Sequence, residues 1–305
     1  KTLKKLNNEI IKYKKKLFAI SNNEKIIISD FGTDSIFKNK QVSIAKQKKY
    51  HLMYKFFNNK GYLSHEMMLN TSSIQLSLDY SSLKEGEILA YLADSLHPFF
   101  SILFSNSPFW HYKTVGKQNV RELIWSNTDH SRCNSLFEHG IYHHEKLIDN
   151  YINFLLKVPA IFYLSTNNNI SAFKGTLEQY LIKILNEEYL DEKILKNTLR
   201  QIFTNVRFKN ILEIRSADTP PFGFELAPVS FIKGLFRNQN SIDKLLNICN
   251  QWKKQDRKEL IEFSKNLDLD QIWNGKKIIY WCELLLEISI NGLNSKEFIY
   301  LNSFN

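Results

Sequence analysis

Three polar side chains follow one face of a predicted strand over residues 67–80. Apolar and polar residues alternate along this segment, and the polar face carries Thr71, Gln75 and Asp79. A hydroxyl, an amide and a carboxylate in a line can hold a polar substrate or a metal-bound phosphate. The alternative is an ordinary solvated strand face, because antiparallel sheets commonly expose one side to water.

A second predicted strand, over 206–217, places charges of both signs on one face: Arg207, Lys209, Glu213 and Arg215. Buried ions need charged partners or metals, so such a face implies a charged ligand. Glu213 offers a hard oxygen ligand, and Arg215 offers a clamp for an anion. The alternative is a salt-bridged pair on the surface.

The stretch 119–134 shows little helical or strand periodicity, which predicts a loop. It contains Arg121, Trp125, Asp129 and Arg132. An arginine can clamp a carboxylate through two parallel hydrogen bonds while an indole shapes the pocket. The alternatives are a plain surface loop and an arginine that tethers its own loop, for example to Asp129.

Two other types of site are absent from the sequence. His139, His143 and His144 invite a zinc interpretation, which we reject because adjacent histidines cannot share one helix face and companion cysteines are missing. Neither a Walker A loop nor a Rossmann fingerprint occurs. A nucleotide would therefore have to be held through carboxylate-bound magnesium.

The composition indicates a globular protein: 305 residues, 43% of them hydrophobic. The net charge of +10 suits either a nucleic acid or a phosphorylated small molecule, but many lysines lie in asparagine-rich surroundings typical of a solvated face, which argues against nucleic acid. No apolar run reaches the roughly 18 residues that cross a bilayer. Three scattered cysteines suit a reducing cytoplasm.

Helical periodicity alternates with short strand patterns. Besides the two polar strands, we expect strands over 25–30 and 158–164. We expect helices over 1–20, 82–104, 143–156, 176–187, 191–203, 228–237, 241–265 and 277–292. With no repeat and no linker, this pattern predicts one α+β domain whose helices pack on one side of a mostly antiparallel sheet.

Five stretches, in order, resemble plant-type and proteobacterial glutamate–cysteine ligases. MMLNTSSIQLSLDYSS is similar to the family's MM-x-x-T-x-x-x-Q-x-x-x-D strand, and LHPFFSILFSNSPF to the helix and NSPF turn that follow it. VRELIWSNTDHSRCN resembles the R-x-x-I-W-x-x-T-D-x-x-R element, and VPAIF the VPMYF strand. VRFKNILEIRSADTPPF resembles the V-R-x-K-x-x-L-E-x-R-x-A-D-x-x-P run. The similarity is clearest over residues 25–235.

The resemblance implies a glutamine-synthetase-like fold, in which a curved antiparallel sheet holds ATP, magnesium and glutamate. It also implies a reaction, the ATP- and Mg²⁺-dependent joining of the glutamate γ-carboxylate to the amine of cysteine through an acyl phosphate, the first step of glutathione biosynthesis. One alternative is a related carboxylate–amine ligase with another amine. A second is a non-catalytic or nucleic-acid-binding relative.

The resemblance implies that Arg121 clamps a glutamate carboxylate while Trp125 and Thr71 line the same pocket. Two departures concern the acceptor amine. Ile161 stands where the family's VPMYF strand has tyrosine, and residues 216–221 replace a glycine-rich turn. Activation of glutamate is therefore better supported than specificity for cysteine.

The resemblance further implies that Glu213 and Gln75 face the metal, that Gln75 and Arg215 contact the nucleotide, and that Arg132 and Arg215 neutralise developing charge. The family's early G-x-E-x-E strand, which resembles a source of magnesium ligands, is expected to precede Lys1. We therefore expect residues 1–305 to be a single catalytic domain that lacks its N-terminal metal-binding strand.

Overall fold

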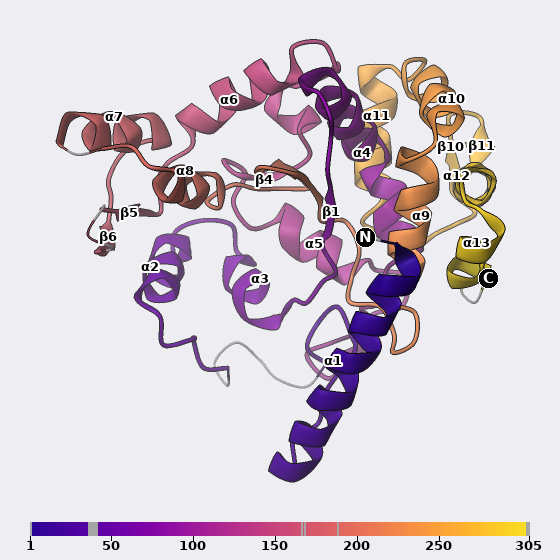
Figure 1. The fold of residues 1–305 in the computed structure, drawn as a ribbon, viewed down its shortest axis with the longest axis horizontal. Helices are drawn as coiled ribbons and strands as arrows, with labels where there is room; N and C mark the ends of the chain where they lie inside the picture. Colours follow the sequence, from indigo (N-terminus) through magenta and orange to yellow (C-terminus); the bar gives the residue numbers. More distant parts are fainter. Residues whose placement is uncertain (1, 36–41, 166, 168, 188, 303–305) are drawn as a thin grey trace.

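The structure is a computed structural model that describes residues 2–35, 42–165, 167, 169–187 and 189–302. It mixes helices with small, mainly antiparallel sheets (Figure 1). The helices are α1 Leu3–Glu24, α2 Lys48–Phe57, α3 Ser64–Asn70, α4 Leu83–Leu103, α5 Val120–Ser126, α6 Leu147–Lys157, α7 Leu177–Glu187, α8 Glu192–Leu199, α9 Ala227–Phe236, α10 Gln239–Cys249, α11 Lys254–Phe263, α12 Ile278–Gly292 and α13 Ser295–Asn302.

The strands are short, and most of them pair in twos. They are β1 Leu76–Leu78, β2 Phe109–Trp110, β3 Lys113–Thr114, β4 Cys133–Asn134, β5 Phe162–Leu164, β6 Ile170–Ala172, β7 Phe203–Thr204, β8 Val206–Phe208, β9 Leu212–Ile214, β10 Ile272–Trp273 and β11 Lys276–Lys277. The pair β4–β7 is parallel, and the others are antiparallel. The larger glutamine-synthetase-like sheet stays a prediction.

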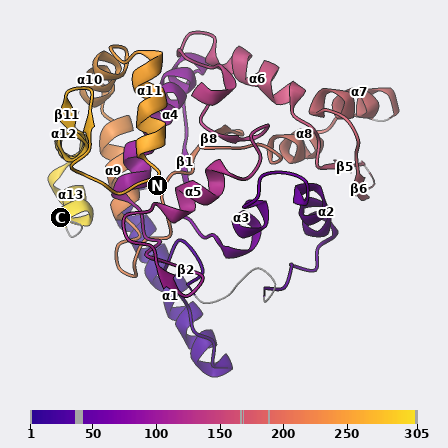
Figure 2. The ribbon, with the colours of Figure 1, turned by 180° about the vertical axis from the view of Figure 1, so that it is seen from behind.

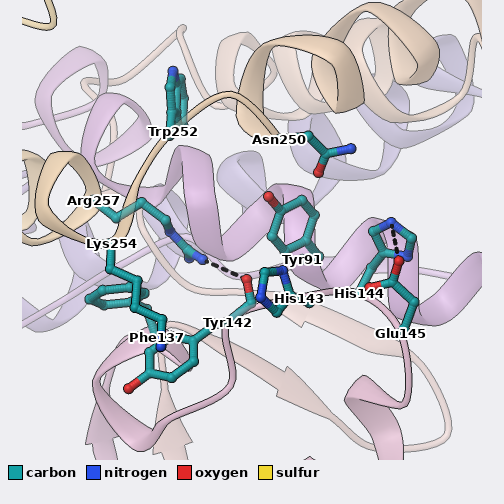
Figure 3. A pocket seen from close by; sticks show the side chains of 10 residues that line it. All are labelled: Tyr91, Phe137, Tyr142, His143, His144, Glu145, Asn250, Trp252, Lys254 and Arg257. Atoms are coloured by element: carbon teal, nitrogen blue, oxygen red, sulfur yellow. Dashed lines mark hydrogen bonds and ion pairs between the residues drawn. The ribbon is translucent and has the colours of Figure 1, made fainter.

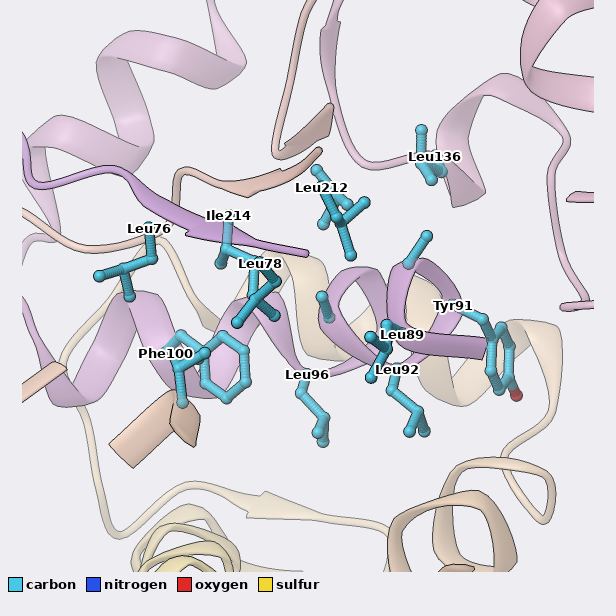
Figure 4. Close-up of a cluster of buried hydrophobic side chains, with 14 of the residues drawn as sticks. Leu76, Leu78, Leu89, Tyr91, Leu92, Leu96, Phe100, Leu136, Leu212 and Ile214 are labelled. Carbon is cyan, nitrogen blue, oxygen red and sulfur yellow. The ribbon is translucent and has the colours of Figure 1, made fainter. Parts of the chain in front are cut away.

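A three-stranded sheet in the order β1–β9–β8 lies at the centre of the molecule. Its even-numbered residues are apolar and pack on α4, as Leu78, Leu212 and Ile214 do beside Leu96 (Figure 4). The odd-numbered side chains point to the opposite face, because successive residues of a strand alternate. One face of the sheet therefore belongs to the core, and the other carries the polar residues.

Helix α4 confirms the helix expected over 82–104. Ser82 caps its N-terminus by accepting a hydrogen bond from the backbone N–H of Glu85, at 3.1 Å. The carboxylate of Glu85 returns to the N–H of Ser81, at 2.6 Å, one residue earlier than a standard capping box requires. Most of the helix is buried, so α4 is the central element around which the sheet and the C-terminal helices pack.

The C-terminal helices cover α4 on the side away from the sheet (Figures 1 and 2). Helices α9 and α12 cross closely at two glycines: a Cβ atom on Gly292 would lie 2.0 Å from the carbonyl oxygen of Gly234. The expectation of one helix over 241–265 is wrong, because α10 and α11 are separate. Buried Trp252 continues the apolar pattern across the break, and the extended backbone of Lys253 starts α11.

The hairpin β8–β9 replaces the single strand predicted over 206–217. Its register pairs Arg207 with Glu213 and Phe208 with Leu212, so three residues form the turn. An odd number of turn residues preserves the alternation, and the predicted charged face therefore survives as two facing strands.

Two other strand predictions also change. The segment 25–30 forms no strand within the described residues, and the side chain of Ile27 is 95% exposed. The strand expected over 67–80 is only β1, because residues 67–70 complete α3. The hydroxyl of Thr71 ends that helix by donating to the carbonyl of Met67, at 2.8 Å.

Candidate functional site

A cavity of about 390 Å³ opens on the polar face of the central sheet. Its cationic lining residues are Lys49, Arg200, Arg207, Lys209 and Arg215, and no Asp or Glu is among the described residues that line it. Cations on several walls of one concave site attract anions strongly. The cavity is therefore suited to a ligand with several negative charges.

Glu213 lies behind these cations and organises them. Its Oε2 accepts from Arg207 Nε at 2.8 Å and from Arg215 Nη1 at 3.2 Å, and its Oε1 accepts from Lys209 Nζ. Burial opposes ionisation of Glu213, but Arg207, Lys209 and Arg215 outweigh burial and lower its pKa to about 2. One carboxylate thus holds three cations in place and leaves a local charge excess of two.

Arg215 is a buried cation of this cluster, 7% exposed beside 6% for Arg207. Burial, followed by the neighbouring charge of Arg207, lowers its pKa to about 10, so it stays protonated at neutral pH. Its guanidinium lies 5.3 Å from the centre of the Trp125 ring and donates to Gln75 Oε1 at 3.2 Å. These contacts fix the guanidinium at the cavity wall without neutralising it.

Trp125 reaches the cavity from α5, which corrects the loop predicted for residues 119–134. Val120 and Ile124 form a buried pair four residues apart. Arg121 and Trp125 have the same spacing, and the Arg121 guanidinium lies 5.7 Å from the centre of the Trp125 ring. The helix is too short for this periodicity to stand out in the sequence. Buried Asn119 fixes its start by donating to the carbonyl of residue 264 at 2.9 Å.

Thr71 and Gln75 also line the cavity, as the polar strand face predicted. Ser73 lies between them, and its neighbour across an isolated bridge is Asp218. Asp79 does not line this cavity; it borders a groove near α1, and its carbonyl accepts from Arg237. The predicted polar face is therefore divided between two sites.

Arg121 lies behind Trp125 and is only 4% exposed. Its Nη2 donates to the carbonyl of Arg215 at 3.0 Å, and its Nη1 lies 3.7 Å from Asp218 Oδ1. It does not line the 390 Å³ cavity, although Trp125 and Arg215 do. The carboxylate-clamp role stays a prediction, whereas the observed contacts tie α5 to the backbone that carries Arg215.

Arg132 is fully buried and makes its hydrogen bonds inside the protein. Its Nε donates to Asp129 Oδ2 at 2.7 Å, its Nη1 to the carbonyl of Gln201 at 3.0 Å, and its Nη2 to the carbonyl of Pro159 at 2.6 Å. Asp129 therefore pairs with Arg132 and not with Arg121. The charge-neutralising role of Arg132 stays a prediction. The observed contacts indicate a structural role, because they join Asp129, Pro159 and Gln201.

The predicted magnesium ligands do not fit a metal site among the described residues. Glu213 accepts from three cations, and Gln75 Oε1 accepts from Arg215. Nowhere in the described ranges do three or more His, Cys, Asp or Glu residues form a group that could hold a metal. Divalent cations need several oxygen ligands, which this face does not supply. The metal role of Glu213 and Gln75 therefore stays a prediction without support from these contacts.

Sequence reasoning missed the far wall of the cavity. Lys49 of α2 and Arg200, just after α8, contribute two of its cations. Gln201 holds this wall together, because its Oε1 accepts from the backbone N–H of Ile161 at 2.7 Å. Helix α2 was not predicted, and its lysines look like an ordinary solvated run in the sequence. Only the fold brings them to the same cavity as Arg215.

In the described part of the chain, no helix is both long enough and apolar enough to cross a membrane. The cytoplasmic location stays a prediction, since the relatives described next carry names that place them in the chloroplast.

Comparison with known proteins agrees with the motifs that meet in the cavity. The chain is 28% identical over 279 residues to the chloroplastic glutamate–cysteine ligase of Arabidopsis thaliana, covering 89% of this chain and 53% of that protein. It is 27% identical over 271 residues to the enzyme of that name from Medicago truncatula, covering 88% and 53% of the two chains. The chain thus spans about half the length of these relatives. The model of glutamate-cysteine ligase family 2 (GCS2) matches residues 1–266, and the chain therefore belongs to this family.

Proposed function

We propose that the 390 Å³ cavity binds ATP and glutamate in an ATP-dependent glutamate–cysteine ligase. The observation that carries the proposal is convergence: Thr71 and Gln75, Trp125, Ile161, and Arg215 come from four separate stretches and line one cationic cavity. Both proposed substrates are anions, and the family of the chain supplies the reaction class. The proposed fold around this cavity is the glutamine-synthetase-like sheet that the resemblance implies.

The proposed reaction has two steps. A γ-carboxylate oxygen of glutamate attacks the γ-phosphorus of ATP, forming an acyl phosphate as the bond to ADP breaks. The amine of cysteine then attacks the acyl carbon, an amide forms, inorganic phosphate leaves, and the amine gives up a proton. No protein nucleophile is needed, so the contribution of the chain is to position the reactants and to stabilise charge.

Arg215 is the residue that we propose to contact the transferring phosphoryl group or the carboxylate that attacks it. Its fixed, charged guanidinium can donate parallel hydrogen bonds to either group. Arg207 and Lys209 extend the same cationic wall, and Glu213 positions all three cations. ATP is commonly bound as its magnesium complex, but the described oxygen ligands do not form a site for the metal.

The cavity also has an apolar part, which suits a small apolar group on the acceptor amine. Met53, Met67, Ile161 and Phe162 line the cavity beside the polar residues. A thiol side chain fits such a wall because sulfur is weakly polar and polarisable. A ligase for another small amino acid is the second candidate, since Ile161 places no hydroxyl in this wall.

The test is a substrate panel with the purified protein that contains this chain. ADP release and γ-glutamyl product are measured with magnesium, ATP and glutamate, and with cysteine, alanine, serine or 2-aminobutyrate as the amine. We expect ADP release to require glutamate and cysteine to be the preferred amine. A stronger preference for another amine would support the second candidate. Product formation that does not consume ATP would contradict the whole proposal.

A further inference from the structure

A second cavity shares no lining residue with the first. It has a volume of about 230 Å³ and is bordered by α4, the loop 142–145 and the start of α11 (Figure 3). Helices α2 and α8, which flank the first cavity, are far from α11 in both views of the ribbon (Figures 1 and 2). A ligand here would not contact the site proposed for ligation.

Two cations of this cavity lie over aromatic rings, and the charge of one of them, Arg257, is also balanced by Asp94. Lys254 Nζ lies 3.6 Å from the centre of the Tyr142 ring, and no carboxylate among the described residues forms an ion pair with it. The Arg257 guanidinium lies 4.7 Å from the centre of the Phe137 ring and 5.6 Å from that of Tyr91. An aromatic face holds a cation in position without cancelling its charge.

Arg257 is rigid and has donors to spare. The residue is 5% exposed, its Nη2 donates to Asp94 Oδ2 at 3.0 Å, and its Nη1 donates to the carbonyl of Tyr142 at 3.3 Å. A guanidinium has five N–H donors. These two bonds therefore fix its plane and leave other N–H groups for a ligand.

The remaining lining groups favour an anion with a planar body. His143 and His144 add imidazoles, and the only carboxylate among the described lining residues is Glu145, whose exposed side chain lies 3.5 Å from His144. In Figure 3, Arg257, His143 and Tyr91 surround the centre of the cavity. The rings offer apolar surface, and the cations offer charge.

From this geometry we propose that the second cavity binds a compact organic anion, a phosphate ester or a carboxylate attached to a small planar group. The volume suits a ligand of about the size of phenyl phosphate. Because it lies apart from the first cavity, this is a binding site in addition to the proposed catalytic one.

The test is calorimetric titration of the protein with phenyl phosphate, benzoate and neutral benzyl alcohol. It is run on the Arg215→Gln variant, which weakens anion binding at the first cavity, and the Lys254→Gln change described below separates binding at the second cavity from what remains at the first. We expect both anions to bind at millimolar concentrations and benzyl alcohol not to bind. Tighter binding of phenyl phosphate would assign the site to phosphate esters, and equal binding would assign it to organic anions in general.

Lys254→Gln is the variant that removes one cation from the second cavity. The side chain of Lys254 is exposed, and the change leaves the Arg257–Asp94 ion pair in place. We expect it to weaken anion binding roughly tenfold, the loss of about one charge-assisted contact. Lys258→Gln, an equal charge change at an exposed position of the same helix, should leave binding unchanged. Equal binding by the Lys254 and Lys258 variants, or no binding of either anion before any change at Lys254, would overturn the proposal.

Discussion

Two clusters that contain arginine differ in how their charge is balanced. Around Glu213, three cations share one carboxylate and face the cavity. Around Arg132, one guanidinium meets one carboxylate and two carbonyls, and Arg132 is not among the described residues that line either cavity. The first cluster has charge left for a ligand, and the second has none.

The charge balance around an arginine distinguishes a ligand-binding role from a structural role better than the residue type does. Arginine in a motif is equally compatible with both roles, because the guanidinium serves carboxylates, phosphates and carbonyls alike. The balance of charge around each guanidinium decides its role. We therefore expect changes in the Arg132 cluster to act on stability and changes at Arg215 to act on ligand binding.

The largest effect is expected for Arg132→Met, which leaves Asp129 buried without its partner. Burial raises the pKa of Asp129, and Arg132 is the main group that lowers it below its usual range. Breaking a buried pair costs roughly 3–5 kcal/mol. Urea unfolding should show a loss of that size. Arg200→Met, at an exposed wall of the cavity, is the control and should change the free energy of unfolding by less than about 0.5 kcal/mol. Similar losses of unfolding free energy in the two variants would show that Arg132 has no special structural role.

Glu213→Gln tests whether one carboxylate holds the open cluster together. The pKa of Glu213 is about 2 in the folded chain against an ordinary 4.5, so its stabilisation is complete above pH 4.5 and is lost as the pH falls toward 2. The shift corresponds to a stabilisation on the order of 3 kcal/mol. Unfolding measured between pH 7 and pH 3 should show a gap between the two proteins that narrows with acid. A gap independent of pH would show that Glu213 does not stabilise the fold through its charge.

Arg121→Lys should have a smaller effect and distinguishes two interpretations. The observed contacts to the carbonyls of Arg215 and Ser216 predict a stability loss of about 1–2 kcal/mol and similar rises in KM for glutamate, cysteine and ATP. The motif-based clamp predicts a rise in the KM for glutamate alone, roughly ten- to a hundredfold. We expect similar rises in all three KM values. A rise in the KM for glutamate alone would support the carboxylate-clamp role of Arg121.

The sequence was sufficient for the helices with long apolar periodicity, such as α4 and α12, and for the alternation along β1 and the hairpin. It was insufficient where elements are short. The seven residues of α5 contain two spaced pairs but no sustained period, and the three-residue turn between β8 and β9 carries no glycine to mark it. The periodicity of a segment can be recognised only when the segment is long enough to repeat it.

For the site, four residues of the motifs, Thr71, Gln75, Trp125 and Arg215, line one cavity, and their roles stay predictions. The motifs could not show which arginines face it, because the direction of a side chain depends on partners distant in sequence. Arg132 is pinned by the carbonyls of Pro159 and Gln201, neither of which the sequence connects to it. Contacts between residues distant in the sequence determine which arginines face the cavity, and motif spacing does not contain this information.

The most direct test of the charge-excess account is the affinity for ATP, measured by calorimetry in the intact protein and in Arg215→Gln. We predict that this change weakens binding roughly tenfold or more while the midpoint of thermal unfolding stays near that of the parent, since Glu213 keeps two other cations. Lys244→Gln, an equal charge change at an exposed position of α10, should bind ATP with the affinity of the intact protein. Unchanged ATP affinity in a folded Arg215→Gln protein would contradict the account.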